Sequence, residues 1–196
     1  MPQPATGART SAGLVACCVL AACASPAGTD APSGAAVDWS STTYTLTCDG
    51  IVPGGLRATV VDGYARVPAD EGRPPYYAHY DVRVADTATG DLDGDDELDA
   101  VVLLECSPQP SNGIVQEVQL LSPTGELRGT LPSPRDLQGT APLPPEYRPA
   151  GLSIRNGEIV AAMTAYGPDD VHASGPSVPL TVRWRYDGRD FVRVTS

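Results

Sequence analysis

Residues 90–104 read Gly-Asp-Leu-Asp-Gly-Asp-Asp-Glu-Leu-Asp-Ala-Val-Val-Leu-Leu, an acidic segment that runs directly into an apolar one. The apolar end, Ala100 to Leu104, contains no polar residue and consists mostly of residues that prefer β-strands. A continuous apolar run of this length predicts a central strand that is covered on both faces. We therefore take this strand as the centre of the expected fold.

Alternation of apolar and polar residues predicts further strands on either side. Residues 77–85 place Ala78, Tyr80, Val82 and Val84 on one face, which is typical of a half-buried strand. The other predicted strands are 43–48, the strand–turn–strand 56–67 around Asp62-Gly63, 114–121 paired with 126–131, 152–155 and 159–166 around Asn156-Gly157, and 180–186 and 191–194 around Asp187-Gly188. Residues 132–150 contain six prolines and are expected to form a long surface loop.

Composition favours an all-β fold. Gly and Pro number 20 each among 196 residues, and 41% of the residues are hydrophobic, so turns are frequent and a core is still available. No long amphipathic helix is evident. Nine or ten short strands predict antiparallel hairpins that form a sandwich, a curved sheet or a barrel-like structure. The net charge of −11 argues against a general nucleic-acid binder, which needs a basic surface.

The N-terminal segment has the features of an export signal. The apolar run from Ala12 to Ala24, about 13 residues, is too short to span a bilayer but has the length of a signal-peptide core. It ends in Leu20-Ala21-Ala22-Cys23, which resembles the lipobox of bacterial envelope lipoproteins. The resemblance implies cleavage before Cys23, acyl chains such as palmitate on that residue, and anchoring to the outer side of the cell membrane. The alternative is an ordinary secretory signal with an incidental cysteine.

This interpretation divides the chain into three parts. Residues 1–22 are the predicted signal peptide, residues 23–37 the lipidated Cys and a flexible tether rich in small and polar residues, and residues 38–196 a single β-rich extracytoplasmic domain. The mature domain then retains Cys48 and Cys106. In an exported protein two remaining cysteines most simply form one disulfide, with two buried free thiols as the alternative.

The acidic loop 91–99 is the main candidate site. Six of its nine residues are acidic, and such closely spaced charges repel unless a cation neutralises them. Side-chain oxygens from alternate positions and one backbone carbonyl would supply the ligands: Asp91, Asp93, Asp95 and Asp99, with the carbonyl of Glu97. With one carboxylate bidentate these give six oxygens, a number that Ca²⁺ accepts. The alternative is a solvated acidic turn without an ion.

The pattern DxDGDxxxD followed by an apolar strand resembles the Ca²⁺ loops of the FG-GAP/VCBS family, the integrin-type repeats. The resemblance covers residues 90–104 in a single copy, so it implies a calcium-clamped turn and not a propeller. One departure is Asp96, at a position where that family usually has Gly. We expect the ion to be structural, because the loop leads into the strand that carries Cys106.

Motifs of known enzymes are not evident in the sequence. His79 and His172 are each expected at the surface, and the arginines at 183, 185, 189 and 193 are expected to form a solvated strand face. We therefore favour a non-enzymatic, membrane-anchored binding or structural domain with a possible envelope or wall partner. The alternative is an extracytoplasmic hydrolase that acts on envelope material.

Overall fold

The computed structural model describes residues 36–70 and 76–195. These described residues belong to one compact unit. The predicted signal peptide, Cys23 and the predicted tether up to residue 35 lie outside the described residues, as do residues 71–75.

The fold is all-β, as predicted, and its sheets are antiparallel. A two-stranded ribbon contains β1 (Thr43–Leu46) and β2 (Leu56–Thr59). A five-stranded sheet has the order β3 (Tyr64–Pro68), β4 (His79–Gly90), β5 (Asp99–Gln109), β6 (Val115–Leu121) and β7 (Leu127–Thr130). A four-stranded sheet has the order β11 (Phe191–Arg193), β10 (Val178–Tyr186), β9 (Glu158–Ala165) and β8 (Glu146–Arg155). A single 3-10 turn, η1 (Pro134–Leu137), is the one helical segment in the described ranges.

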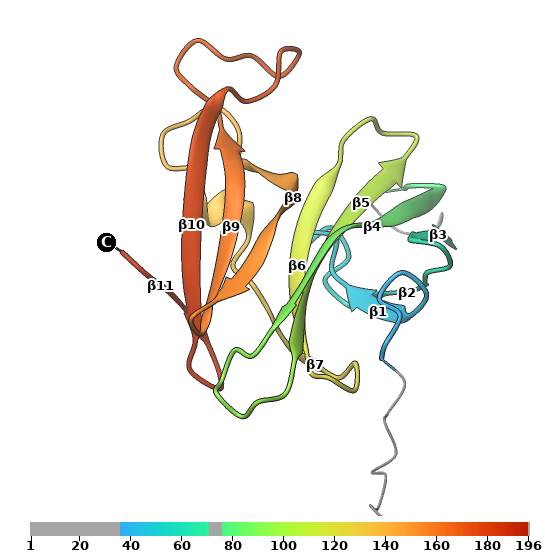
Figure 1. The fold of residues 1–196 in the computed structure, drawn as a ribbon. Helices are drawn as coiled ribbons and strands as arrows, with labels where there is room; N and C mark the ends of the chain where they lie inside the picture. The colour runs from blue at the N-terminus through green and yellow to red at the C-terminus, as the bar shows by residue number, and fades with distance from the viewer. Residues whose placement is uncertain (1–35, 71–75, 196) are drawn as a thin grey trace, which may run out of the picture. The chain divides into compact units, whose positions relative to one another are not determined.

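Three layers result, with the five-stranded sheet in the middle (Figure 1). Side chains that alternate along β5 enter two different cores. Val102, Leu104 and Cys106 pack with the β1–β2 ribbon, whereas Val101 and Leu103 pack with the four-stranded sheet. All five of these residues are buried. The prediction of a central strand covered on both faces is therefore confirmed, and the layers are consistent with the predicted sandwich or curved sheets.

The predicted hairpin turn at Asn156-Gly157 is also confirmed. β8 and β9 are joined at Asn156 and Gly157, whose φ values of 53° and 70° lie in the left-handed region. A two-residue turn with positive φ at both positions matches the twist of the flanking strands, and Asn-Gly is its preferred sequence. The turn sets the register in which Ile154 pairs with Ile159.

Two predicted segments differ from the structure. Asp62-Gly63 does form a turn, but the strands that it joins belong to different sheets, because β2 pairs with β1 and β3 with β4. Residues 132–150 are not one long loop, since they contain η1 and the start of β8. Pro149 is tolerated in β8 because β8 is an edge strand and its register shifts between Tyr147 and Leu152.

Candidate functional site

The acidic loop joins β4 to β5, the two neighbouring strands at the centre of the five-stranded sheet. Gly90 and Asp99 are paired where the loop begins and ends. Gly94 and Asp96 have φ values of 85° and 65°, so the chain turns twice through the left-handed region. Asp96 therefore adopts a conformation that Gly takes most easily and that Asp tolerates better than most residues. The position that departs from the FG-GAP/VCBS pattern thus keeps the backbone form that a Gly would favour.

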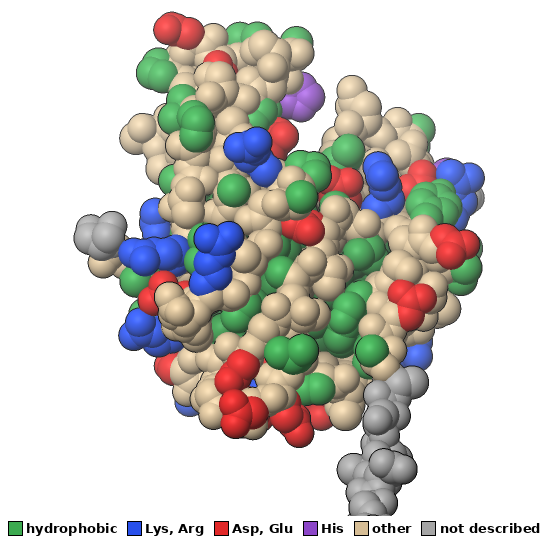
Figure 2. All heavy atoms as spheres, viewed as in Figure 1, with side chains coloured by type: hydrophobic (Ala, Val, Ile, Leu, Met, Phe, Trp, Pro, Cys, Tyr) green, Lys and Arg blue, Asp and Glu red, His purple; other side chains and the backbone are tan. Residues whose placement is uncertain are grey.

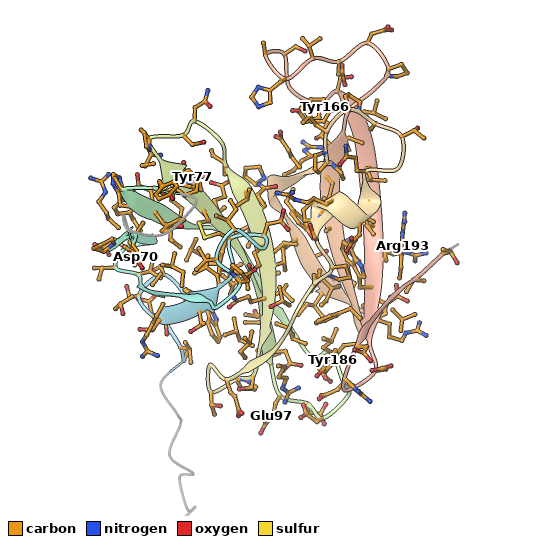
Figure 3. The ribbon with its side chains drawn as sticks, turned by 180° about the vertical axis from the view of Figure 1, so that it is seen from behind. Asp70, Tyr77, Glu97, Tyr166, Tyr186 and Arg193 are labelled. Carbon is orange, nitrogen blue, oxygen red and sulfur yellow. A yellow bond between two sulfur atoms is a disulfide. The ribbon has the colours of Figure 1, made fainter. Side chains whose placement is uncertain are left out.

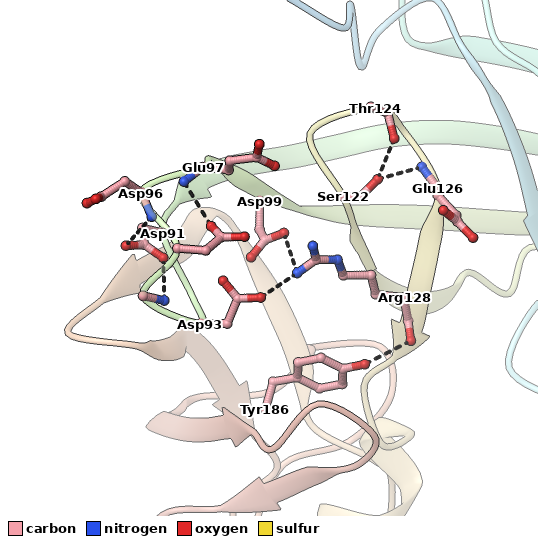
Figure 4. Close-up of polar contacts among 12 residues, drawn as sticks. Asp91, Asp93, Asp96, Glu97, Asp99, Ser122, Thr124, Glu126, Arg128 and Tyr186 are labelled. Carbon is pink, nitrogen blue, oxygen red and sulfur yellow. Dashed lines mark hydrogen bonds and ion pairs between the residues drawn. The ribbon is translucent and has the colours of Figure 1, made fainter.

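Three of the predicted ligands converge within this loop. Carboxylate oxygens of Asp91, Asp93 and Asp95 lie within 4.8 Å of one another, so this group could hold a metal ion. Backbone amides orient two of them: Gly94 donates to Asp91 at 2.7 Å, and Glu97 donates to Asp95 at 2.9 Å (Figure 4). These bonds fix the directions in which the carboxylates of Asp91 and Asp95 point.

Asp99, the fourth predicted side-chain ligand, lies at the buried edge of the loop. Its side chain is 2% exposed, and Oδ1 lies 3.0 Å from a nitrogen of Arg128. Burial raises the pKa of Asp99, and the charges of Asp93 and Asp95 act in the same direction. The Arg128 charge and a backbone hydrogen bond from Leu92 oppose them. Such a carboxylate needs a positive partner to stay ionised.

Arg128 supplies that positive charge. This residue on β7 places Nη1 2.9 Å from Asp93 Oδ2 and 3.0 Å from Asp99 Oδ1 (Figure 4). Burial would lower the pKa of Arg128, but its hydrogen bond to Asp93 and the nearby acidic charges outweigh that effect and raise it. No local sequence pattern points to this residue. It lies 29 positions after Asp99, and only the pairing of β5, β6 and β7 brings the two together.

The fifth predicted ligand position, Glu97, contributes differently. Its backbone amide donates the hydrogen bond to the Asp95 carboxylate given above, and its side chain is exposed. Figure 4 places the carboxylates of Asp96 and Glu97 at the outer side of the loop, away from Arg128. Their charges therefore add to the negative potential at the loop without joining the three converging carboxylates.

A disulfide links the opposite part of β5 to the ribbon. Cys48 and Cys106 are bonded, with their Cα atoms 5.5 Å apart, and they are separated by 58 positions in the sequence. Cys48 follows β1, and Cys106 lies on β5. The central strand is thus preceded by the acidic loop and tied to the ribbon near its other end, as the sequence analysis expected for the disulfide.

A groove lies at the end of the unit opposite the acidic loop. Figure 3 shows Tyr166 at one end and Glu97 at the other, and Figure 2 shows a hollow between the loop after β9 and the β5–β6 turn. Two adjoining cavities of about 360 and 390 Å³ share four lining residues: Asp49, Gln116, Pro134 and Arg135. His172 lines the second cavity although its side chain is exposed, and the Tyr166 hydroxyl donates to Glu146 there at 3.1 Å. No sequence pattern predicts this groove, because its lining residues come from distant segments of the chain.

The remaining candidates have surface positions. His79 lies on β4, with Nε2 3.7 Å from Asp81. Arg183 and Arg185 face Glu158 at 3.6 and 2.9 Å, so one acidic residue offsets part of the predicted basic face. Arg193 projects from the outer side of the four-stranded sheet (Figure 3).

Comparison with known proteins adds no assignment. No family model, no curated protein and no solved structure matches this chain. Within residues 36–70 and 76–195, no helix has the length and apolar character needed to cross a membrane.

Proposed function

We propose that the chain is a lipid-anchored extracytoplasmic protein whose β domain is non-enzymatic and is stabilised by one calcium ion and one disulfide. The observation that carries the calcium part is the convergence of Asp91, Asp93 and Asp95 at the entry to the central strand, beside the buried Asp99. Its partners would be the membrane, through the lipid on Cys23, and an envelope or wall component.

The donor set favours calcium over other cations. All of its donors are oxygens, the hard ligands that Ca²⁺ and Mg²⁺ prefer. A short loop with several carboxylates suits the flexible coordination of calcium better than the strict octahedron of magnesium, which retains several waters. Extracellular calcium modules bind with dissociation constants of about 10⁻⁴–10⁻³ M, which is adequate outside the cytoplasm.

A bound ion would act on stability because of where the loop lies. The loop precedes β5, which contributes to both cores, and the disulfide joins that strand to the ribbon. An ion that binds only the folded state stabilises it by RT ln(1 + [L]/Kd), about 2.7 kcal/mol when its concentration is one hundred times Kd. We therefore propose that calcium stabilises the β4–β5 hairpin and with it the centre of the fold.

Thermal unfolding of the full chain with added calcium tests this proposal. We expect millimolar calcium to raise Tm, and we expect Asp93→Asn together with Asp95→Asn to abolish the increase. Asp62→Asn is a matched control, because Asp62 is an exposed acid in a turn with positive φ outside the loop. No increase in wild-type Tm at about 10 mM calcium would rule out the structural ion.

The anchor has its own test. Cys23→Ala should prevent acyl labelling and cleavage at that site, because the lipobox mechanism requires the thiol. Cys18→Ala, which changes a cysteine inside the apolar run, should leave both unchanged. Labelling and processing of the Cys23→Ala variant would show that the anchor assignment is wrong.

The second candidate function is an extracytoplasmic hydrolase. It is favoured by the presence of His172, Glu146 and Tyr166 in one cavity, since such groups are used in general acid–base catalysis. Hydrolysis of envelope polymers by the purified chain, lost in His172→Ala or Glu146→Gln with Tm unchanged, would favour this function over the non-enzymatic one.

A further inference from the structure

One nitrogen atom of Arg128 is in contact with two carboxylates of the acidic loop. Nη1 lies 2.9 Å from Asp93 Oδ2 and 3.0 Å from Asp99 Oδ1 (Figure 4). The Arg128 side chain is 26% exposed, so it lies against the loop and does not extend into solvent. A positive charge from a distant strand therefore occupies the space between two of the predicted cation ligands.

Asp99 explains why a positive charge is needed there. Its carboxylate is almost fully buried, and the ion pair with Arg128 is the largest of the interactions that oppose the effect of burial, ahead of the Leu92 backbone. A buried charge that lacks a partner is strongly destabilising. Figure 4 shows the Asp99 carboxylate directed toward Arg128 and Asp93, which is also the side from which a cation could be bound.

Asp93 belongs both to the group of converging carboxylates and to the ion pair with Arg128. Its carboxylate is one of the three whose oxygens converge, and it also accepts the hydrogen bond from Arg128. A divalent cation held by Asp93 would lie only a few ångströms from the guanidinium. Like charges at such a separation repel strongly where solvent screening is reduced. The guanidinium and the cation therefore compete for the same carboxylate.

We propose that Arg128 is a resident counterion of the acidic loop, which a calcium ion must displace from Asp93 and Asp99, and that Arg128 thereby sets the calcium affinity. This inference rests on the proposed calcium site. Displacement would free Asp99 to join the other three carboxylates, which completes the side-chain ligands expected from the sequence. While calcium is absent, Arg128 keeps the buried charge paired and the loop formed.

Calcium titration of the full chain by calorimetry tests the inference. Arg128→Gln removes the competing charge and should lower Kd for calcium at least tenfold. Arg66→Gln is a matched control: Arg66 lies on β3 at the other edge of the same sheet, pairs with Asp81 at 2.8 Å and carries the same charge. Its removal should leave the calcium affinity within about twofold of wild type, because charges far apart at the surface are screened.

The outcomes separate the two proposals. Calcium binding by wild type with no gain in Arg128→Gln overturns the inference and leaves the calcium site standing. An equal gain in Arg66→Gln also overturns it, since the effect would then come from net charge. Absence of calcium binding in both wild type and Arg128→Gln overturns both proposals.

A second variant and a second measurement test the inference even if Arg128→Gln does not fold. Arg128→Lys keeps the positive charge and should bind calcium with nearly wild-type affinity, so a tenfold gain in this variant would contradict the inference. If Arg128→Gln unfolds without calcium, the ion should restore the fold, because it replaces the missing charge. No recovery in circular dichroism at about 10 mM calcium would overturn the proposal.

Discussion

Gly90 and Ile154 are in contact across two layers of the domain. A Cβ atom on Gly90 would lie 2.8 Å from Ile154 Cβ and 2.9 Å from its Cγ2. Gly90 is the last residue of β4, and Ile154 is on β8. The absence of a side chain at residue 90 therefore allows the five-stranded and four-stranded sheets to approach at the point where the acidic loop begins.

This contact predicts the effect of a small substitution. Gly90→Ala should destabilise the domain by about 1–3 kcal/mol, because a methyl group cannot enter a filled interface without displacing its neighbours. Gly54→Ala is the control, since a Cβ at Gly54 would meet no atom within 4 Å. Urea unfolding monitored by tryptophan fluorescence measures both variants. Equal stability of Gly90→Ala and wild type would contradict the close approach.

Removal of the disulfide should have a larger effect. Replacing Cys48 and Cys106 together with Ser opens a loop of 58 residues, for which chain entropy predicts a loss of about 4 kcal/mol. The loss should be visible as a lower urea midpoint without reductant. With reductant, wild type should approach the double variant. An unchanged midpoint in the variant would show that the bond contributes little to stability.

We expect the hydrogen bonds of Glu117 to stabilise the packing of the β1–β2 ribbon against the five-stranded sheet. This buried carboxylate accepts hydrogen bonds from Thr47 N at 2.9 Å, Thr47 Oγ1 at 2.8 Å and Gln119 Nε2 at 2.9 Å. Glu117→Gln puts an NH₂ group opposite donors, so one buried partner is left unsatisfied at a cost of about 1–3 kcal/mol.

Thr47→Ala provides the comparison for Glu117. It removes the hydroxyl donor but keeps the backbone donor, and we expect a smaller loss. Hydrogen exchange of the β1 amides should increase in Glu117→Gln more than in Thr47→Ala. The reverse order would mean that the carboxylate is not what holds the ribbon.

We expect the ionised carboxylate of Asp81 to stabilise the folded state, and we expect this contribution to be lost in acid. The hydrogen bond from Arg66 lowers the pKa of Asp81 below its ordinary 3.8, with further lowering by Tyr64 and His79. A lowered folded-state pKa means that the contribution is fully present above the unfolded value and is lost as pH falls through the folded value. Wild type should therefore be more stable than Asp81→Asn at pH 7, and the difference should shrink as pH falls below 3.8 and through the lowered pKa of the folded state. A difference that persists in acid would contradict this origin.

The predictions from sequence succeeded where a local pattern was sufficient. Alternation along β4 correctly placed Tyr80 and Val82 on its buried face, and the apolar run correctly placed Val102 at the centre. The turn at Asp62-Gly63 was predicted correctly, but the two strands that it joins were not recognised as members of different sheets. Periodicity shows which face of a strand is apolar, and it does not show which strand is its neighbour.

In the candidate site, too, local features were predictable from the sequence and contacts between distant segments were not. The acidic loop and its three converging carboxylates were predictable, because residues within nine positions of one another remain close in any tight turn. The two cysteines could be paired by elimination, once the others were assigned to the signal segment. Arg128 and the groove residues His172 and Glu146 had no local signal, since their neighbours are distant in the sequence.

The sequence by itself determined the strand-forming segments, the tight turns, the concentration of negative charge at residues 91–99 and the cysteines available for a disulfide. Only the tertiary structure decided that Arg128 lies beside Asp99 and that the ribbon and the four-stranded sheet cover the two faces of β5. The physical reason is that these relationships depend on the order of strands in each sheet. That order is selected by the free energy of burying whole faces against one another, and no short segment contains that information.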